Sequence, residues 1–448
     1  MDGLGLGALS IVAVEWIGLG WLSGIDWPAS DSSPEQTFWP ARWALRLLVG
    51  SCLTAVAQLM LALVGPGFGS VPLVLASASV GAAAVRGAQR RWVLPCPSPN
   101  KNPPTKLGQP ERAGWLLLGL VLVLATMRAL LVPEAGWDAF SHWGLSAQAF
   151  ALAGTIVDAH SEHEYYPPLV PLLEAWLYLH RGLVSIDLGK TVSPLIASAF
   201  MVCLAWHLRL RLRLAWLAPW FSIGIALGTT ALLESFWTGQ ADLALTAYFT
   251  LATLAALQWQ AAPSRLWLVQ AALFAAAATL AKVEGLPRIG VVVAALVLEA
   301  LLTRRSVAKT AVAALILVTA SGAAALLWTA FEATHGITLN AEHFGPFQPL
   351  ALGGVLLSLA AVFGGIRTGG GILVACLAWA AAGPRMLSGR LRLISLVVLG
   401  ELAATVLGFL FSSTSPDTEV RTSATRLFEQ FLPLALFAGA LGLSKVRL

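Results

Sequence analysis

Long apolar runs separated by short polar loops dominate the sequence. A run of about 20 apolar residues is long enough to cross the hydrocarbon core of a bilayer as one helix. The pattern therefore predicts an all-α polytopic membrane protein with about 13 transmembrane helices. The predicted spans are 4–22, 43–64, 71–85, 114–132, 191–208, 214–232, 243–257, 266–281, 289–302, 310–331, 370–382, 394–411 and 428–443.

The basic residues of the loops predict how the chain is threaded through the membrane, because Lys and Arg are enriched in cytoplasmic loops. Two further apolar segments, 167–180 and 349–366, would disturb this assignment if they crossed the bilayer. We therefore expect short re-entrant or interfacial helices in both segments. Arg288 does not fit the assignment, because this basic residue lies in a loop that is placed outside. The loops placed inside are 86–112, 209–213, 304–309 and 385–392, and those placed outside are 133–166, 234–242, 282–288, 332–347 and 412–426.

Composition excludes several classes of protein. Hydrophobic residues make up 57% of the chain and charged residues 11%, against about 25% charged residues in soluble domains, so disorder and a soluble enzyme are excluded. The net charge of +5 is spread over many loops, which indicates membrane topology and no nucleic-acid partner. The four cysteines have no zinc or haem spacing. No cofactor is certain, and a divalent metal is not indicated.

The loop 133–166 is the first of several loops that carry conspicuous polar residues on the predicted outer side. Helical periodicity begins at Asp138, and Phe140, Trp143, Ala147 and Phe150 share a face that we expect on the membrane surface. Asp138 and His142 are four residues apart and share another face. Asp138 is equally well explained as a helix cap. The His and Glu residues of 160–164 are explained by a solvated polar loop rather than a metal site.

The other outer loops carry charges at the ends of apolar spans. An ionisable group near mid-bilayer costs about 2.5–3.5 kcal/mol, so such groups tend to face a cavity. The alternative is that they are interfacial charges that pair with each other or anchor a helix end. The charged residues concerned are Asp242, Lys282, Glu284, Arg421 and Arg426, and the uncharged Gln240 lies in the same loop as Asp242.

Four segments of the sequence follow one another in this order: WDAFSHW at 137–143 with YPPL at 166–169, GQADL at 239–243, KVEGLP at 282–287, and 414–426 followed by LPL at 432–434. Together they resemble the GT-C membrane glycosyltransferases, which use polyprenyl-phosphate sugars and include the protein mannosyltransferases and the lipid A aminoarabinose transferase. The resemblance begins near residue 110 and continues to the C-terminus. It divides the chain into an N-terminal three-helix membrane segment with a cytoplasmic loop, 1–112, and a GT-C-like transmembrane catalytic module, 113–448.

The resemblance implies an inverting glycosyltransferase that moves a sugar from a polyprenyl-phosphate donor to a glycan, lipid or protein acceptor. The active site would face the extracytoplasmic side of a bacterial plasma membrane. A phosphate monoester has a second pKa of about 6 and leaves without an acid, so one carboxylate suffices as general base. The implied roles are base for Asp138, donor phosphate binding for Arg426, Arg421 and Lys282, and sugar or acceptor pocket for His142, Glu164, Tyr165, Tyr166, Gln240, Asp242 and Glu284.

The chain departs from this family's pattern in two respects. Many relatives carry two adjacent acidic residues in the first loop, whereas Asp138 is followed by Ala139. The large soluble C-terminal domain of the oligosaccharyltransferases is absent, along with their metal-site pattern. Two alternatives stay open: a transporter or flippase for lipid-linked glycans, and a GT-C relative without catalytic activity.

Overall fold

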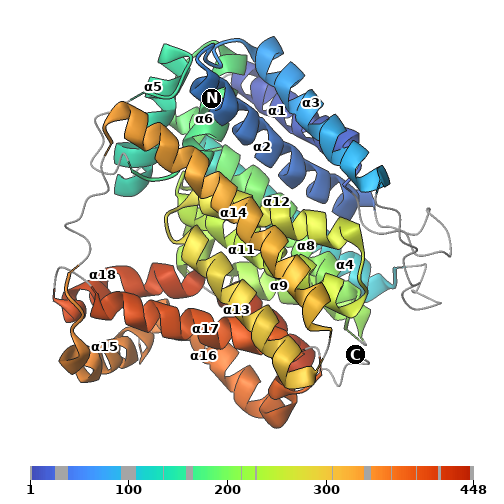
Figure 1. The fold of residues 1–448 in the computed structure, drawn as a ribbon, viewed down its shortest axis with the longest axis vertical. Coiled ribbons are helices and arrows are strands. Elements are labelled where there is room, and N and C mark those ends of the chain that lie inside the picture. The colour runs from blue at the N-terminus through green and yellow to red at the C-terminus, as the bar shows by residue number, and fades with distance from the viewer. Residues whose placement is uncertain are drawn as a thin grey trace.

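The chain folds into helices, which run mostly side by side (Figure 1). The computed structural model describes residues 3–25, 39–91, 107–134, 136–157, 165–212, 214–227, 230–304, 306–337, 345–364, 366–389, 391–411 and 415–443, and it places no strand among them. The α-helices are α1 Gly3–Ser23, α2 Trp39–Val64, α3 Val71–Arg91, α4 Gln109–Leu131, α5 Leu145–Ala153, α6 Leu169–Arg181, α7 Ile186–Gly189, α8 Val192–Arg209, α9 Ala218–Leu227, α10 Thr230–Ser235, α11 Ala241–Ala261, α12 Arg265–Ala281, α13 Gly285–Thr303, α14 Val307–His335, α15 Leu352–Gly364, α16 Ile366–Ala382, α17 Leu391–Leu410, α18 Pro416–Glu429 and α19 Leu432–Leu443.

Eight helices within the described residues are long and apolar enough to cross a membrane. They are α1, α2, α4, the α7–α8 pair, α11, α13, α14 and α17; α18 and α19, bent by 53° at their junction, would together make a ninth. Five shorter apolar helices of 10–17 residues accompany them. The all-helical class is thus confirmed, and the number of 13 spans stays a prediction.

The two segments expected to be short helices are α6 and α15, of 13 residues each. At 1.5 Å per residue such a helix is about 20 Å long, less than the roughly 30 Å of the hydrocarbon core. Helix α6 begins after two prolines and ends at Gly182 in the left-handed conformation. It is buried from Leu169 to Tyr178, which fits a re-entrant helix inside the bundle.

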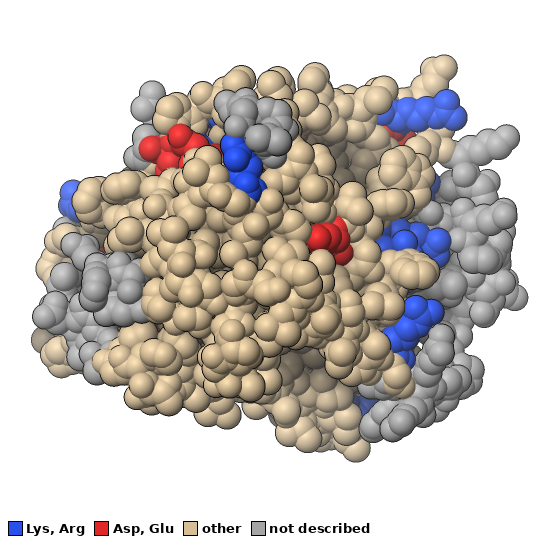
Figure 2. Space-filling model, turned by 90° about the horizontal axis from the view of Figure 1, so that it is seen from above, with Lys and Arg blue, Asp and Glu red and all other residues tan. Residues whose placement is uncertain are grey.

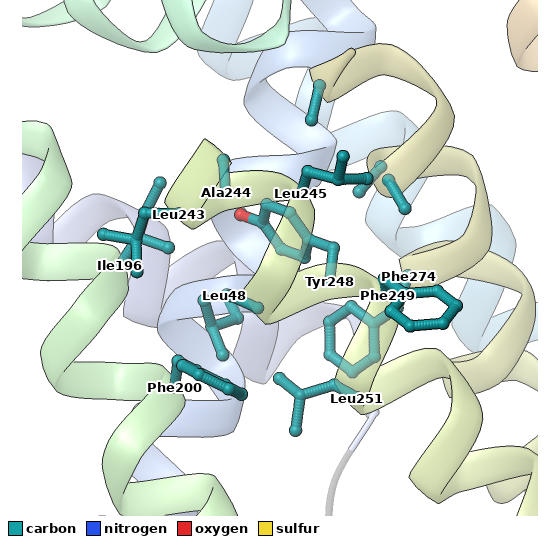
Figure 3. Close-up of a cluster of buried hydrophobic side chains, with 14 of the residues drawn as sticks. Leu48, Ile196, Phe200, Leu243, Ala244, Leu245, Tyr248, Phe249, Leu251 and Phe274 are labelled. Atoms are coloured by element: carbon teal, nitrogen blue, oxygen red, sulfur yellow. The ribbon is translucent and has the colours of Figure 1, made fainter. Parts of the chain in front are cut away.

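Helix α11 forms the centre of the bundle, where α8 and α12 pack against it (Figure 3). All its residues from Ala241 to Leu257 are buried. Tyr248 packs beside Phe274 of α12, with ring centroids 5.9 Å apart, and its hydroxyl hydrogen-bonds Ser51 Oγ of α2 at 2.8 Å. Since lipid tails are as apolar as leucine, such close packing and internal hydrogen bonds hold membrane helices together. This core fixes the start of α11, which carries Asp242.

Glycines let α1 and α2 approach each other closely. A Cβ at Gly20 would lie 2.1 Å from the Arg46 carbonyl oxygen, and one at Gly50 would lie 1.9 Å from that of Trp16. No side chain fits at either place. The two helices are therefore in backbone contact, as at small-residue interfaces in membranes.

The apolar face expected on the membrane surface is instead mostly buried. Trp143, Ala147 and Phe150 are at most 4% exposed, and only Phe140 of the four, at 51%, faces outward. The reason is that α5 and the helical turn Ala139–Gly144 before it pack against α6, whose apolar side chains cover that face. The prediction was therefore wrong for three of the four side chains.

The face of the molecule drawn in Figure 2 carries few charged side chains. On the face shown in Figure 2, Lys, Arg, Asp and Glu appear as isolated spots on a mostly uncharged surface. Many leucines on α4 and α14 are exposed, Leu116 by 76% and Leu326 by 70%. Such a surface suits a lipid environment.

Candidate active site

Polar side chains from five separate parts of the chain lie at one end of the bundle, where α11 and α13 begin. They come from the first loop, the segment before α6, the start of α11, the α12–α13 junction and the end of α18. The arrangement gives two linked groups: an ion pair that joins the first loop to α18, and a buried cluster around Asp242.

The first group is the ion pair between Asp138 and Arg426, 288 positions apart in the sequence, in which Arg426 Nη1 donates to Asp138 Oδ2. Asp138 directly precedes a π-helix, Ala139–Gly144; single π-turns are frequent at functional sites. Within the described part of the loop, Asp138 forms no capping hydrogen bond with this helix, so the cap interpretation is wrong. Both side chains are about one third exposed, 33% for Asp138 and 39% for Arg426.

The second group is centred on Lys282, which is 4% exposed. Its Nζ donates to Asp242 Oδ1 at 3.1 Å and lies 3.3 Å from Glu284 Oε1. Burial lowers the pKa of Lys282, but the carboxylates of Asp242 and Glu284 outweigh burial and hold the pKa above its ordinary value. Lys282 is therefore a fixed cation at neutral pH.

The α12–α13 junction owes its shape to Gly285. A Cβ at this position would lie 2.0 Å from the Ala278 carbonyl oxygen, so only glycine permits the tight turn. Lys282 itself is extended, with φ −155° and ψ 159°. The turn therefore places Lys282 and Glu284 next to the start of α11.

Aromatic side chains lie beside the cluster. The Tyr166 ring centroid is 4.9 Å from that of Tyr165 and 5.0 Å from that of Trp143, and Lys282 Nζ lies 5.8 Å from the Tyr166 ring. Burial first, and then Asp242 and Glu284, raise the pKa of Tyr166, and burial raises that of Tyr165. Both phenols therefore stay neutral and keep their O–H donors. Trp328 of α14 donates to the Tyr165 carbonyl oxygen at 3.1 Å and fixes this segment.

The remaining predicted residues are placed less centrally. His142 is buried in the π-helix, with Nδ1 3.4 Å from Ser141 Oγ. Gln240 directly precedes α11 and is partly buried. Arg421 is exposed on α18, and five residues before Arg426 it lies on a different side of that helix. Glu164 lies outside the described residues.

No group of three or more His, Cys, Asp or Glu side chains that could hold a metal ion occurs in the part of the chain that the structure describes. The segment 160–164 lies outside that part.

Sequence reasoning missed Glu134, Glu401 and Gln430. Glu134 accepts hydrogen bonds from the Gly136 N–H at 2.6 Å and the Gly239 N–H at 3.4 Å, which ties the first loop to the start of α11. Glu401 is a buried carboxylate in the middle of α17. An ionisable residue inside an apolar span is a functional signal in itself, and that signal could have found Glu401.

Comparison with known proteins gives one structural relative. No protein-family model matches the sequence, and no curated protein is significantly similar to it. The fold is similar to the crystal structure of ArnT from Cupriavidus metallidurans bound to undecaprenyl phosphate, with a TM-score of 0.52 and 16% sequence identity. The similarity covers 73% of this chain and 60% of the ArnT chain. Together with its apolar helices, this similarity shows an integral membrane protein with a GT-C-like fold.

Proposed function

We propose that the protein is an inverting glycosyltransferase that moves a sugar from a polyprenyl-phosphate donor to an acceptor hydroxyl. The observation that carries the proposal is the meeting of Asp138 and Arg426, a carboxylate and a guanidinium brought together by the fold. The GT-C-like fold supports it, since the structural neighbour was crystallised with undecaprenyl phosphate.

Asp138 is the proposed general base. Its carboxylate is partly exposed, so an acceptor hydroxyl can reach it, whereas Asp242 is committed to Lys282 and Gln430. The base takes the proton from the acceptor oxygen as that oxygen attacks the anomeric carbon. The bond from the anomeric carbon to the phosphate oxygen breaks at the same time, and a single displacement of this kind inverts the anomeric centre.

Arg426 and Lys282 are the proposed partners of the donor phosphate. Fixed cations facing the charge that develops on the leaving group are usually the largest electrostatic contribution to catalysis. Arg426 can bind phosphate through two N–H groups, and its side chain is partly exposed, so a phosphate can reach it. Lys282 is buried and neutralised by two carboxylates, so we assign it the supporting position. Arg421 is exposed on another side of α18 and is the weakest of the three.

The remaining residues form the proposed sugar and acceptor pocket. Tyr165 and Tyr166 present aromatic rings on which a sugar can stack. Glu284, with its side chain 27% exposed, can accept hydrogen bonds from sugar hydroxyls. His142 and Gln240 are assigned to the same pocket on their place in the sequence motifs, and Glu164 on its place in the first outer loop.

The pocket is proposed to face the extracytoplasmic side of a bacterial plasma membrane. The basic loops predicted to be cytoplasmic adjoin the opposite ends of the helices: α8 ends at Arg209 and α13 ends before Arg304. The donor's polyprenyl tail would stay in lipid beside the apolar surface, while its phosphate reaches Arg426. The acceptor is a glycan, lipid or protein hydroxyl.

The test is transfer from labelled lipid-linked sugars by the protein reconstituted in proteoliposomes. We expect Asp138→Asn to lower transfer by about 10²–10⁴-fold, the usual contribution of a general base. The matched control is Glu234→Gln, which removes an exposed carboxylate at the end of α10 and should leave transfer unchanged. Full transfer by Asp138→Asn would overturn the assignment of the base. Binding of undecaprenyl phosphate by the wild type without transfer from any donor would indicate an inactive relative.

A further inference from the structure

Arg288 is the basic residue that the predicted topology does not explain, and the structure gives it a specific place. It lies in the first turn of α13 and is 5% exposed. Its Nη1 pairs with Glu401 Oε2 of α17, which is 1% exposed. Its Nη2 donates to Gln430 Oε1 at 2.5 Å and to the Leu427 carbonyl oxygen at 3.1 Å. Arg288 thus reaches from α13 to both α17 and the end of α18.

Gln430 links this arginine to the candidate site. Its Oε1 accepts from Arg288, and its Nε2 donates to Asp242 Oδ1, the oxygen that also accepts from Lys282. An arginine can only donate and an ionised carboxylate can only accept, so the neighbours dictate the orientation of the amide. A glutamate at this position could not donate to Asp242, and a methionine could serve neither partner.

The same contacts hold the turn of α18 that carries Arg426. Gln430 follows Arg426 by four residues, one helical turn, and its N–H donates to the Arg426 carbonyl oxygen at 3.3 Å. The last carbonyls of a helix lack partners within the helix, and Arg288 satisfies that of Leu427 from outside. The chain then bends by 53° into α19. Arg288 therefore fixes the end of α18 at the bend.

We propose that Arg288 is a positioning residue for phosphate recognition, acting through Gln430 and the Leu427 carbonyl on Arg426 and on the Asp242–Lys282 pair. The inference rests on the proposed function, because it takes Arg426 and Lys282 to be the phosphate-binding cations. The positive charge of Arg288 is already neutralised by Glu401. Its contribution is therefore the geometry of its planar fork, which a lysine cannot reproduce.

The test measures selectivity for the phosphate group. Affinities for undecaprenyl phosphate and for the uncharged alcohol undecaprenol are measured on the purified full chain in detergent, together with the melting temperature. The ratio of the two affinities isolates phosphate recognition from any general loosening of the lipid-binding surface. The variants are Arg288→Lys, which keeps the charge, and Gln430→Met, which keeps the length of the side chain and adds no charge. The control is Arg209→Lys, which alters a buried Arg–Glu pair with Glu111 at the opposite end of the bundle.

We expect Arg288→Lys and Gln430→Met each to lower the phosphate-to-alcohol affinity ratio by about tenfold, the effect of one lost hydrogen bond to a charged group. Arg209→Lys should lower the melting temperature and leave the ratio unchanged. A wild-type ratio in both site variants would overturn the positioning role while leaving the proposed function intact. A wild-type protein that does not distinguish phosphate from alcohol would overturn both. If Arg288→Lys does not fold, the affinity ratio of Gln430→Met alone tests the positioning role.

Discussion

The ion pair between Asp138 and Arg426 leads to a prediction that separates the two residues' roles. In the structure the guanidinium of Arg426 is bound to the carboxylate of Asp138. A donor phosphate that binds Arg426 therefore competes with Asp138 for the same N–H group. Replacing Asp138 by asparagine removes the competing charge and keeps the size of the side chain. Asp138→Asn is thus expected to bind undecaprenyl phosphate more tightly than the wild type, although it transfers less.

The magnitude follows from the exposure of the pair. Both side chains are about one third exposed, and ion pairs at such sites are worth about 0.2–1 kcal/mol. Releasing Arg426 from this interaction converts to an affinity about 1.4- to 5-fold higher. The melting temperature should change little for the same reason. Arg426→Met removes the phosphate partner itself and should weaken binding by about tenfold or more.

The assay is titration of the purified protein in detergent with undecaprenyl phosphate, with the wild type, Asp138→Asn and Arg426→Met compared at one salt concentration. Undecaprenol serves as the uncharged control ligand, and all three proteins should bind it equally. If Asp138→Asn weakens phosphate binding to the level of Arg426→Met, then Asp138 holds Arg426 in place for the ligand, and the competition described above is wrong.

Three further predictions concern packing, stacking and pH. Gly20→Ala places a Cβ against the Arg46 carbonyl and should destabilise the α1–α2 contact by about 1–3 kcal/mol, which a lower melting temperature would show. The control Gly18→Ala has nothing within 4 Å of the new Cβ and should leave the melting temperature unchanged. Tyr166→Ala should lower kcat/KM for the sugar donor by about 2- to 13-fold, which corresponds to the roughly 0.5–1.5 kcal/mol of an aromatic contact. Tyr166→Phe keeps the ring and should keep the wild-type kcat/KM, and equal losses in both variants would refute stacking. The pKa of Lys282 lies above its ordinary value, so the cation persists as pH rises through about 10. The affinity for undecaprenyl phosphate should therefore fall only on the acid side, near the phosphate pKa of about 6. A loss of affinity on the alkaline side, between about pH 8 and 10, would contradict this assignment of Lys282.

The helical class and the polar residues at one end of the bundle were predictable from the sequence, because both depend on local patterns. Apolar run length indicates a membrane helix, and a charge beside such a run indicates a cavity. This ground points to Asp242, Lys282 and Glu284, and the structure brings Lys282 within hydrogen-bond distance of both carboxylates. Their chemical roles stay predictions.

The parts that could not be predicted depend on contacts between distant segments. Periodicity gives the apolar face of the segment 140–150, but only the packing of α6 decides that Trp143 is buried against protein rather than exposed to lipid. Gln430 is an unremarkable residue in the sequence, and its importance comes from lying between Arg288 and Asp242. A pattern that repeats within one helix carries no information about contacts between side chains of different helices.

The length of α14 links the bilayer to the candidate site. With 29 residues the helix is about 44 Å long, longer than a hydrocarbon core of roughly 30 Å, and it crosses the front of the bundle obliquely (Figure 1). A helix with this excess length tilts further as the membrane becomes thinner. Trp328, near its end, donates a hydrogen bond to the carbonyl of Tyr165, so we expect a change of tilt to displace the tyrosine pair. The acyl-chain length of the surrounding lipid is therefore expected to alter the shape of the pocket.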